Sequence, residues 1–220
     1  MAIEYLGLSE INGPLVVLEG VKNASFDEIV EFRVDDGSRK LGRIVEIYEE
    51  KAVIQVFEGT ENMSLQNTHT RLSGHPMEIE LSPEILGRTF DGIGRPIDRL
   101  GPVIPEKKLN INGLPLNPVT REYPRNFIQT GISAIDGLTT LIRGQKLPIF
   151  SGNGLPHDQL AAQIVQQASL GADSDEKFAI VFAAMGVKYD VAEFFRRTFE
   201  ESGVSDHVVM YLNLANDPVV

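Results

Sequence analysis

The sequence contains no cysteine and no tryptophan, and it has only 20 lysine and arginine residues against 31 aspartate and glutamate residues. Without cysteine the chain has no disulfides, no thiol nucleophile and no thiolate ligand for zinc. The formal net charge of −11 disfavours a nucleic-acid binder, because phosphate backbones are bound by basic patches. The same charge disfavours adsorption to anionic lipid.

Long apolar runs are also missing. No stretch approaches the ~20 apolar residues of a transmembrane helix. The start, MAIEYLGLSE, has neither the basic beginning nor the apolar centre of a secretory signal peptide. We therefore expect a cytoplasmic, globular protein that reaches a membrane only through partners. Its 220 residues are enough for one large domain or two small ones.

The N-terminal part of the chain alternates between apolar and polar residues, as half-buried strands do. Asp36 and Gly37 form a turn signal between two such runs, which is typical of a β-hairpin. About six short strands at close spacing predict a small antiparallel β-barrel domain over residues 1–75. The predicted strands lie at residues 14–21, 29–34, 42–48 and 52–57, with another at 77–81.

Residues 76–146 are rich in glycine and proline and read as a loop-rich connector. The one regular element expected there is a short helical segment over residues 82–88, with Ser82 as its N-cap and Pro83 at its first position. Further along, Gly131 and Asp136 are expected to shape a turn and the start of a helix.

The last third of the chain alternates strands with helices, which predicts a parallel α/β sheet. Residues 76–220 are thus expected to be the N-terminal part of a nucleotide-binding-like α/β domain, incomplete at its C-terminus. The strands are predicted at 147–150, at 178–184, where the apolar run indicates burial on both faces, and at 207–215. The helices are predicted at 156–171, capped by Gly171, and at 190–203, capped by Gly203.

A glycine-containing loop joins the apolar run at 147–150 to the first of these helices, and this is the setting of a phosphate-binding loop. The standard motif is G-x-x-x-x-G-K-[ST], in which the lysine contacts phosphates and the hydroxyl binds Mg²⁺. The corresponding residues form a degenerate phosphate loop: Ser151, Gly152, Asn153, Gly154, Leu155, Pro156, His157 and Asp158.

Each substitution weakens the motif. His157 replaces the lysine and is mostly neutral at pH 7, Asp158 brings a negative charge towards the phosphates, and Pro156 has no N–H to donate. The positive helix N-terminus remains. Weak nucleotide binding or none is therefore expected, and no cofactor is assigned. The plain alternative is a glycine-rich turn that is capped by Asp158.

Other constellations carry no chemistry in this interpretation. The four histidines lack the spacing of metal ligands, so no metal site is expected. The G-x-G in residues 91–98 is not placed between a strand and a helix, so it predicts a tight loop. Arg196 and Arg197 are interpreted as an exposed helix face, with binding of an anion or a partner as the alternative.

Five longer stretches together are similar to the non-catalytic chain, named B, of archaeal and vacuolar-type rotary ATPases, and the similarity extends over essentially the whole chain. They are IQVFEGT (54–60), LGRTFDGIGRPID (86–98), FIQTGISAIDGL (127–138), RGQKLPIFSGNGLPHDQLAAQI (143–164) and NLANDP (213–218). The resemblance implies a barrel followed by a P-loop NTPase-like domain that resembles RecA.

The same resemblance implies a non-catalytic, regulatory subunit. Catalytic F-type relatives place a glutamate after the strand that follows the loop helix, and in this sequence that position holds Val187. The implied partners are catalytic A subunits in an alternating hexamer, together with central and peripheral stalk subunits. The implied process is ATP-coupled transport of H⁺ or Na⁺. Family members continue beyond residue 220, so we expect this sequence to be the N-terminal portion of a longer protein.

Two rival interpretations remain open. One is an active ATPase with an atypical loop, although the loop contains no lysine and the nearest ones, Lys146 and Lys188, lie outside it. The other is a stand-alone carbohydrate- or peptide-binding protein with a barrel and an α/β part.

Overall fold

The structure is a computed structural model that describes residues 4–123, 125–170 and 177–217. Contacts divide the chain into two units, and each is described by itself. The first unit draws on residues 1–81, 105–113 and 216–220, and the second on residues 82–104 and 114–215.

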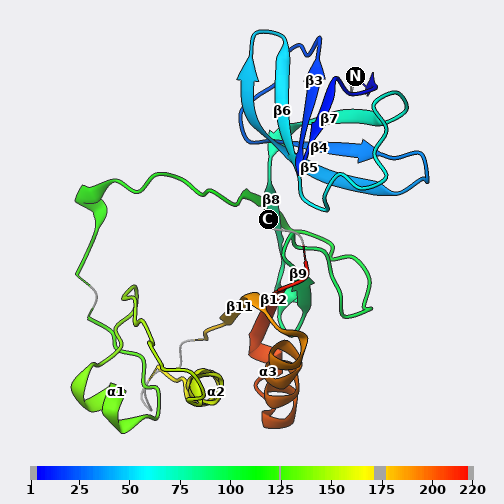
Figure 1. Ribbon diagram of the computed structural model, residues 1–220. Coiled ribbons are helices and arrows are strands. Elements are labelled where there is room, and N and C mark those ends of the chain that lie inside the picture. The colour runs from blue at the N-terminus through cyan, green and yellow to red at the C-terminus, as the bar shows by residue number, and fades with distance from the viewer. Residues whose placement is uncertain (1–3, 124, 171–176, 218–220) are drawn as a thin grey trace. The chain divides into compact units, whose positions relative to one another are not determined.

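Seven antiparallel strands make up the sheet of the first unit (Figure 1). Their order is β1-β7-β4-β5-β6-β3-β2. Although β1 and β2 are the outermost strands, only residues 7–9 connect them, so the sheet must curl until its two edges meet. This confirms the predicted barrel-like fold. The strands are β1 (Glu4–Leu6), β2 (Glu10–Asn12), β3 (Leu15–Glu19), β4 (Glu28–Arg33), β5 (Arg39–Tyr48), β6 (Lys51–Val56) and β7 (His69–Pro76).

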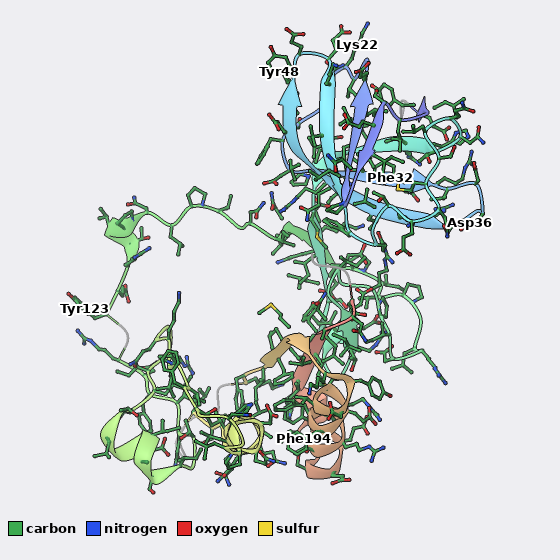
Figure 2. All side chains as sticks on the ribbon, viewed as in Figure 1. Lys22, Phe32, Asp36, Tyr48, Tyr123 and Phe194 are labelled. Carbon is green, nitrogen blue, oxygen red and sulfur yellow. The ribbon has the colours of Figure 1, made fainter. Side chains whose placement is uncertain are left out.

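Alternating side chains fill the inside of this sheet. In β4 and β6 every second residue is buried, and Phe32 lies fully buried among its neighbours (Figure 2). Gly42 in β5 makes this packing possible, because a Cβ there would lie only 3.0 Å from the Phe32 ring and 2.7 Å from the carbonyl oxygen of Gln55. The predicted strands at 14–21, 29–34, 42–48 and 52–57 are all present, and Gly37 in the predicted turn has φ 82°.

Residues 76–146, predicted as a loop-rich connector, contain more regular structure than the sequence suggested. The strand predicted at 77–81 is β8 (Glu78–Leu81), but it pairs with β10 (Lys107–Asn110) in a separate two-stranded sheet. The segment expected to be helical from 82 to 88 is only a 3₁₀ turn, η1 (Pro83–Ile85), and Ser82 caps it as predicted by accepting from the N–H of Glu84 at 3.2 Å.

A short helix, α1 (Ser133–Leu138), follows the 3₁₀ turn η2 (Pro118–Thr120). Asp136 and Gly131 shape its start as predicted. The Asp136 carboxylate accepts from the backbone N–H groups of Thr130 at 2.9 Å and Gly131 at 3.0 Å, and from the Thr130 hydroxyl at 2.7 Å. These hydrogen bonds hold the pKa of Asp136 below its usual range, with the Thr130 side chain as the largest cause.

The second unit contains a sheet in the order β11-β12-β9 (Figure 1). Its strands are parallel, as the sequence predicted. Helix α3 covers one face, where the Phe182 ring of β11 lies 4.6 Å from the Phe195 ring. Helix α2 packs against α3. The elements are β9 (Thr89–Asp91), α2 (His157–Gln167), β11 (Ile180–Val187), α3 (Tyr189–Ser202), η3 (Ser205–His207) and β12 (Val208–Leu214).

Helix α3 ends as predicted, with Gly203 in the left-handed conformation at φ 74°. Helix α2 ends earlier than predicted, at Gln167, and its expected cap Gly171 lies outside the described residues. Residues 147–150 are irregular and do not form the predicted strand, and Phe150 is 91% exposed. An apolar run becomes a strand only when a neighbouring strand pairs with it, and residues 147–150 have no such neighbour among the described residues.

Burial within the sheet also differs from the prediction. Strand β11 is buried on the α3 face only, because nothing among the described residues covers Val181 and Met185 on its other face. Strand β12 is the central strand and is buried on both faces, since Phe90 and Val103 cover its second face through Val209. The sequence could not distinguish these two strands, because both are predominantly apolar.

Candidate functional site

The degenerate phosphate loop connects residues 147–150 with helix α2. Ser151 to His157 are all exposed, and Gly154 adopts φ 82°. Since the preceding residues form no strand, the loop lacks the rigid strand-to-helix setting in which a phosphate loop is normally held. The helix itself begins at His157, and its N-terminus is accessible.

Two backbone donors near the end of this loop are used within the loop itself. The N–H of Leu155 donates to the carbonyl of Gly152 at 3.3 Å, and the N–H of His157 donates to the carbonyl of Leu155 at 2.9 Å. Pro156, between them, has no N–H. A phosphate cradle needs consecutive N–H groups that point towards the anion. Three consecutive residues, 155–157, therefore offer an anion no free backbone donor in this arrangement.

His157 turns back onto its own loop. Its Nδ1 lies 2.9 Å from the Leu155 carbonyl oxygen, so this nitrogen carries the proton. Its Nε2 lies 3.5 Å from the Oδ1 atom of Asp158. Asp158 does not cap the helix, because the N-cap residue is Pro156 and no side chain caps there. The proposed cap at Asp158 is thus wrong: its carboxylate lies in the first helical turn, beside the imidazole.

Val187 is the last residue of β11, and only the N-cap residue Lys188 separates it from the start of α3. It is partly buried against the apolar cluster beneath α3, and its carbonyl accepts from the N–H of Ala215 at 2.8 Å. An aliphatic side chain can neither accept a proton nor orient a water molecule. If a water molecule were to attack a phosphate here, Val187 could not activate it.

The tight loop predicted in residues 91–98 is present. Asp91 accepts from the N–H groups of Ile93 at 3.0 Å and Arg95 at 2.7 Å, which closes the turn at its glycines. Asp98 pairs with Arg88, and sequence reasoning had not identified this ion pair. The two residues are ten positions apart in a segment without periodicity, so no spacing rule could have found them.

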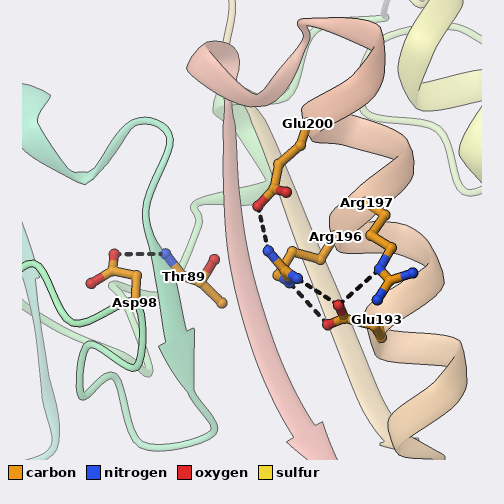
Figure 3. A network of polar contacts seen from close by, with 6 residues as sticks. All are labelled: Thr89, Asp98, Glu193, Arg196, Arg197 and Glu200. Carbon is orange, nitrogen blue, oxygen red and sulfur yellow. Dashed lines mark hydrogen bonds and ion pairs between the residues drawn. The ribbon is translucent and has the colours of Figure 1, made fainter.

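Arg196 and Arg197 belong to a charged network on the exposed face of α3 (Figure 3). Glu193 is its centre and pairs with both arginines, while Arg196 also reaches Glu200 at 2.6 Å. Hydrogen bonding to Arg196 is the main cause that lowers the pKa of Glu193 to about 2. Both arginines are partly exposed, in agreement with the interpretation of an exposed helix face, and both are already paired with carboxylates. The i, i+3 and i, i+4 spacing could have identified Glu193.

A cavity of about 340 Å³ lies in the second unit, away from the loop. It is lined by residues 168–170 at the C-terminal end of α2 and by residues 177–180 before and at the start of β11. The loop and Val187 lie at the opposite ends of these elements. The cavity therefore does not serve as a pocket for a phosphate held at the N-terminus of α2.

Two further features are missing from the part of the chain that the structure describes. No group of three or more histidine, aspartate or glutamate side chains there could hold a metal ion. No described helix has the length and apolar character that crossing a bilayer requires.

Two family matches cover more than half of the chain. Residues 8–68 match the beta-barrel domain of the ATP synthase alpha/beta family, and residues 131–220 match the nucleotide-binding domain of the same family. These matches correspond to the barrel-like sheet and to the unit that contains the degenerate loop.

Curated relatives agree over the whole chain. It is 61% identical to the V-type ATP synthase beta chain 2 of Clostridium tetani, over all of this chain and 48% of that protein. It is 59% identical to the V-type ATP synthase beta chain of Halothermothrix orenii, over 99% of this chain and 47% of that protein. It is 55% identical to the B subunit of the A-type ATP synthase of Cenarchaeum symbiosum, again over 99% of this chain and 47% of that protein.

The chain thus spans about half the length of the curated relatives that it matches. Both of its units, and the loop between residues 150 and 159, fall within these similarities. The chain belongs to the ATP synthase alpha/beta family, and it resembles the V-type and A-type members named as beta chains or B subunits.

Proposed function

We propose that this chain is the N-terminal part of a non-catalytic B subunit in a rotary ATPase of the archaeal and vacuolar type. One observation carries the non-catalytic role: the loop at the N-terminus of α2 has neither a lysine nor a hydroxyl where the motif needs them, and the N–H groups of Leu155 and His157 bond within the loop. Val187, at the position of the activating glutamate, supports the same conclusion.

Transfer of a phosphoryl group depends on positioning and charge stabilisation. His157 is held by the Leu155 carbonyl, so it does not extend towards a β- or γ-phosphate. Asp158 would repel that phosphate. Asp158 could ligate a cation, but it occupies the motif position of the metal-binding hydroxyl, so that hydroxyl is missing. The site can therefore contribute little to nucleotide binding and nothing to hydrolysis.

In this proposal the protein alternates with catalytic A subunits in a hexameric head and contacts central and peripheral stalk subunits. It lies on the cytoplasmic side, supports ATP-coupled transport of H⁺ or Na⁺, and associates with the membrane only through the complex. The relatives' names, which are ATP synthase chains, and the family matches to both units support this assignment.

The decisive experiment combines assembly with turnover. A protein of the relatives' full length should form an alternating ring with its catalytic partner, observed by native mass spectrometry, and should release no phosphate from Mg·ATP by itself. Phosphate release that is abolished by Asp158→Asn alone would identify an active ATPase instead. A stable monomer that ignores the catalytic chain and binds a sugar or peptide would favour the stand-alone binding protein.

A further inference from the structure

The same four residues, Asn-Gly-Leu-Pro, occur twice in the chain, at 112–115 and at 153–156. A third Asn-Gly pair is at 12–13. Asparagine before glycine loses its side-chain amide readily, because glycine leaves its own backbone nitrogen unshielded and lets the backbone rotate. Since two of the three sites share the same local sequence, any difference in their reactivity must come from the structure.

The first pair is fixed in a hairpin of the barrel unit. Asn12 is the last residue of β2 and lies opposite Leu15 of β3. The carbonyl oxygen of Gly13 accepts a hydrogen bond from the Thr60 hydroxyl at 2.6 Å. Rotation of the backbone at Asn12 would therefore break the hairpin.

The second pair is fixed in the turn that follows β10. The N–H of Gly113 donates to the carbonyl oxygen of Asn110 at 3.0 Å, and the N–H of Asn112 donates to the Oδ1 atom of Asn110 at 2.9 Å. The nitrogen that would react is thus already a hydrogen-bond donor. It can attack the side chain of Asn112 only after the turn has opened locally.

The third pair lies in the degenerate loop and is held least. One hydrogen bond closes the turn around it, from the N–H of Leu155 to the carbonyl oxygen of Gly152 at 3.3 Å. Within the described part of the chain, the N–H groups of Asn153 and Gly154 have no hydrogen-bond acceptor. Apart from its chain neighbours, no described atom lies within 4 Å of the position that a Cβ would take at Gly154. A small movement of the loop therefore brings the Gly154 nitrogen to the Asn153 side chain.

We propose that Asn153 is a deamidation site of this protein. The backbone nitrogen of Gly154 attacks the Cγ atom of Asn153, and the new N–Cγ bond closes a succinimide ring. The C–N bond of the side-chain amide breaks, and ammonia leaves with the proton that the Gly154 nitrogen gave up. Water then opens the ring at either of its two carbonyl carbons, which leaves aspartate or isoaspartate at position 153.

Either product changes the charge of the loop. It adds a carboxylate to a segment that already carries Asp158 in the first turn of α2. Negative charge near a helix N-terminus stabilises the helix, but it repels an anionic ligand from the same place. The ageing protein should therefore lose whatever affinity for phosphate the loop still has. The reaction consumes only water and does not depend on the proposed function.

Peptide mapping by mass spectrometry tests the proposal, because trypsin places the three pairs in separate peptides. The 220-residue chain and a protein of the relatives' full length are both incubated at mildly alkaline pH, with a sample in urea as the unfolded reference. In urea Asn112 and Asn153 should react at similar rates. In both folded proteins Asn153 should react at least about tenfold faster than Asn112, which must first lose two hydrogen bonds. Equal rates at these two sites in either folded protein, or a slower rate at Asn153, would overturn the proposal.

Ion-exchange chromatography gives a second readout with matched variants. The folded parent should accumulate an acidic species that elutes near Asn153→Asp. Asn153→Gln should not accumulate it, because the longer side chain closes a ring far more slowly. Asn112→Gln should behave like the parent. An acidic species that persists in Asn153→Gln and disappears in Asn112→Gln would place the reaction in the turn after β10 and refute the assignment.

Discussion

Asp98, in the loop after β9, forms an ion pair with Arg88 and accepts a hydrogen bond from the backbone of Thr89 at the start of β9. The Arg88 Nη2 atom donates to Oδ1 of Asp98 at 3.0 Å and to the Gly101 carbonyl at 2.7 Å, and the Nε atom donates to Oδ2. The backbone N–H of Thr89 donates to Oδ2 at 3.2 Å (Figure 3). Both charged side chains are nearly enclosed, 11% and 14% exposed. The pair therefore determines the path of residues 88–101.

Replacing Asp98 with alanine should strongly destabilise this segment. Removing one partner of a buried ion pair leaves the other charge uncompensated, which costs about 3–5 kcal/mol. Native-state hydrogen exchange of the peptide that contains β9 should show the loss directly. Glu31→Ala, which breaks the exposed pair with Arg39 at 3.0 Å, is the control and should cost at most about 1 kcal/mol. Equal effects of the two changes would contradict the buried pair.

The same pair gives a pH dependence of defined sign. Hydrogen bonding from Arg88 is the largest cause that holds the pKa of Asp98 below its usual range. The ionised carboxylate therefore stabilises the folded state above its unfolded pKa of about 4, and this contribution disappears as pH falls through the lower folded pKa. Urea unfolding between pH 6 and pH 3 should show a steeper loss of stability for the natural chain than for Asp98→Asn. Parallel curves would show that the pair contributes nothing.

Gly131 is a position at which the structure requires glycine. It has φ 74°, and a Cβ there would lie 2.3 Å from the Gln167 Oε1 atom at the end of α2. Gly131→Ala should therefore destabilise the second unit by about 1–3 kcal/mol, through backbone strain and displacement of Gln167. Gly137→Ala, inside α1 with no atom within 4 Å, should be neutral or slightly stabilising. Thermal unfolding followed by circular dichroism compares the two, and a tolerant Gly131 would contradict this geometry.

The barrel was predictable because its information is local. In β4 and β6 the alternation of apolar side chains specifies both the strand and its inner face. In contrast, β7 reads HTRLSGHP, which is too polar for its pattern to indicate a strand. It forms because β4 and β1 pair with it on both sides. Non-local pairing of this kind leaves no trace in a short window of sequence.

The second unit shows the same limit more clearly. Residues 89–91 became a strand through pairing with β12, which is about 120 positions away. The apolar residues 147–150 did not become one, because they have no partner strand among the described residues. The identity of the loop residues 151–158 was readable from the motif. The internal hydrogen bonds of the loop and the inward turn of His157 depend on its conformation, and residue types alone do not determine that.

Rebuilding the loop tests whether it is a relic of a nucleotide site. The quadruple change Ser151→Gly, Pro156→Gly, His157→Lys and Asp158→Thr restores the motif. Glycine at 156 supplies an N–H and removes the ring, and lysine at 157 supplies a charge and frees the Leu155 carbonyl from the imidazole. Threonine at 158 supplies a metal-binding hydroxyl in place of an anion. A charged hydrogen bond to phosphate contributes roughly 1.5–3 kcal/mol.

The affinity of the variant for Mg·ATP should therefore rise about tenfold or more over the parent, since ~1.4 kcal/mol corresponds to one decade. Calorimetric titration of both proteins at the full length of the relatives measures this directly. Hydrolysis should stay absent, because Val187 cannot position the attacking water, and a further Val187→Glu change tests that separation of binding from chemistry. If the quadruple variant binds no better than the parent, the loop does not reach a phosphate-cradling shape even with the right residues. Its resemblance to a nucleotide site would then be one of sequence alone.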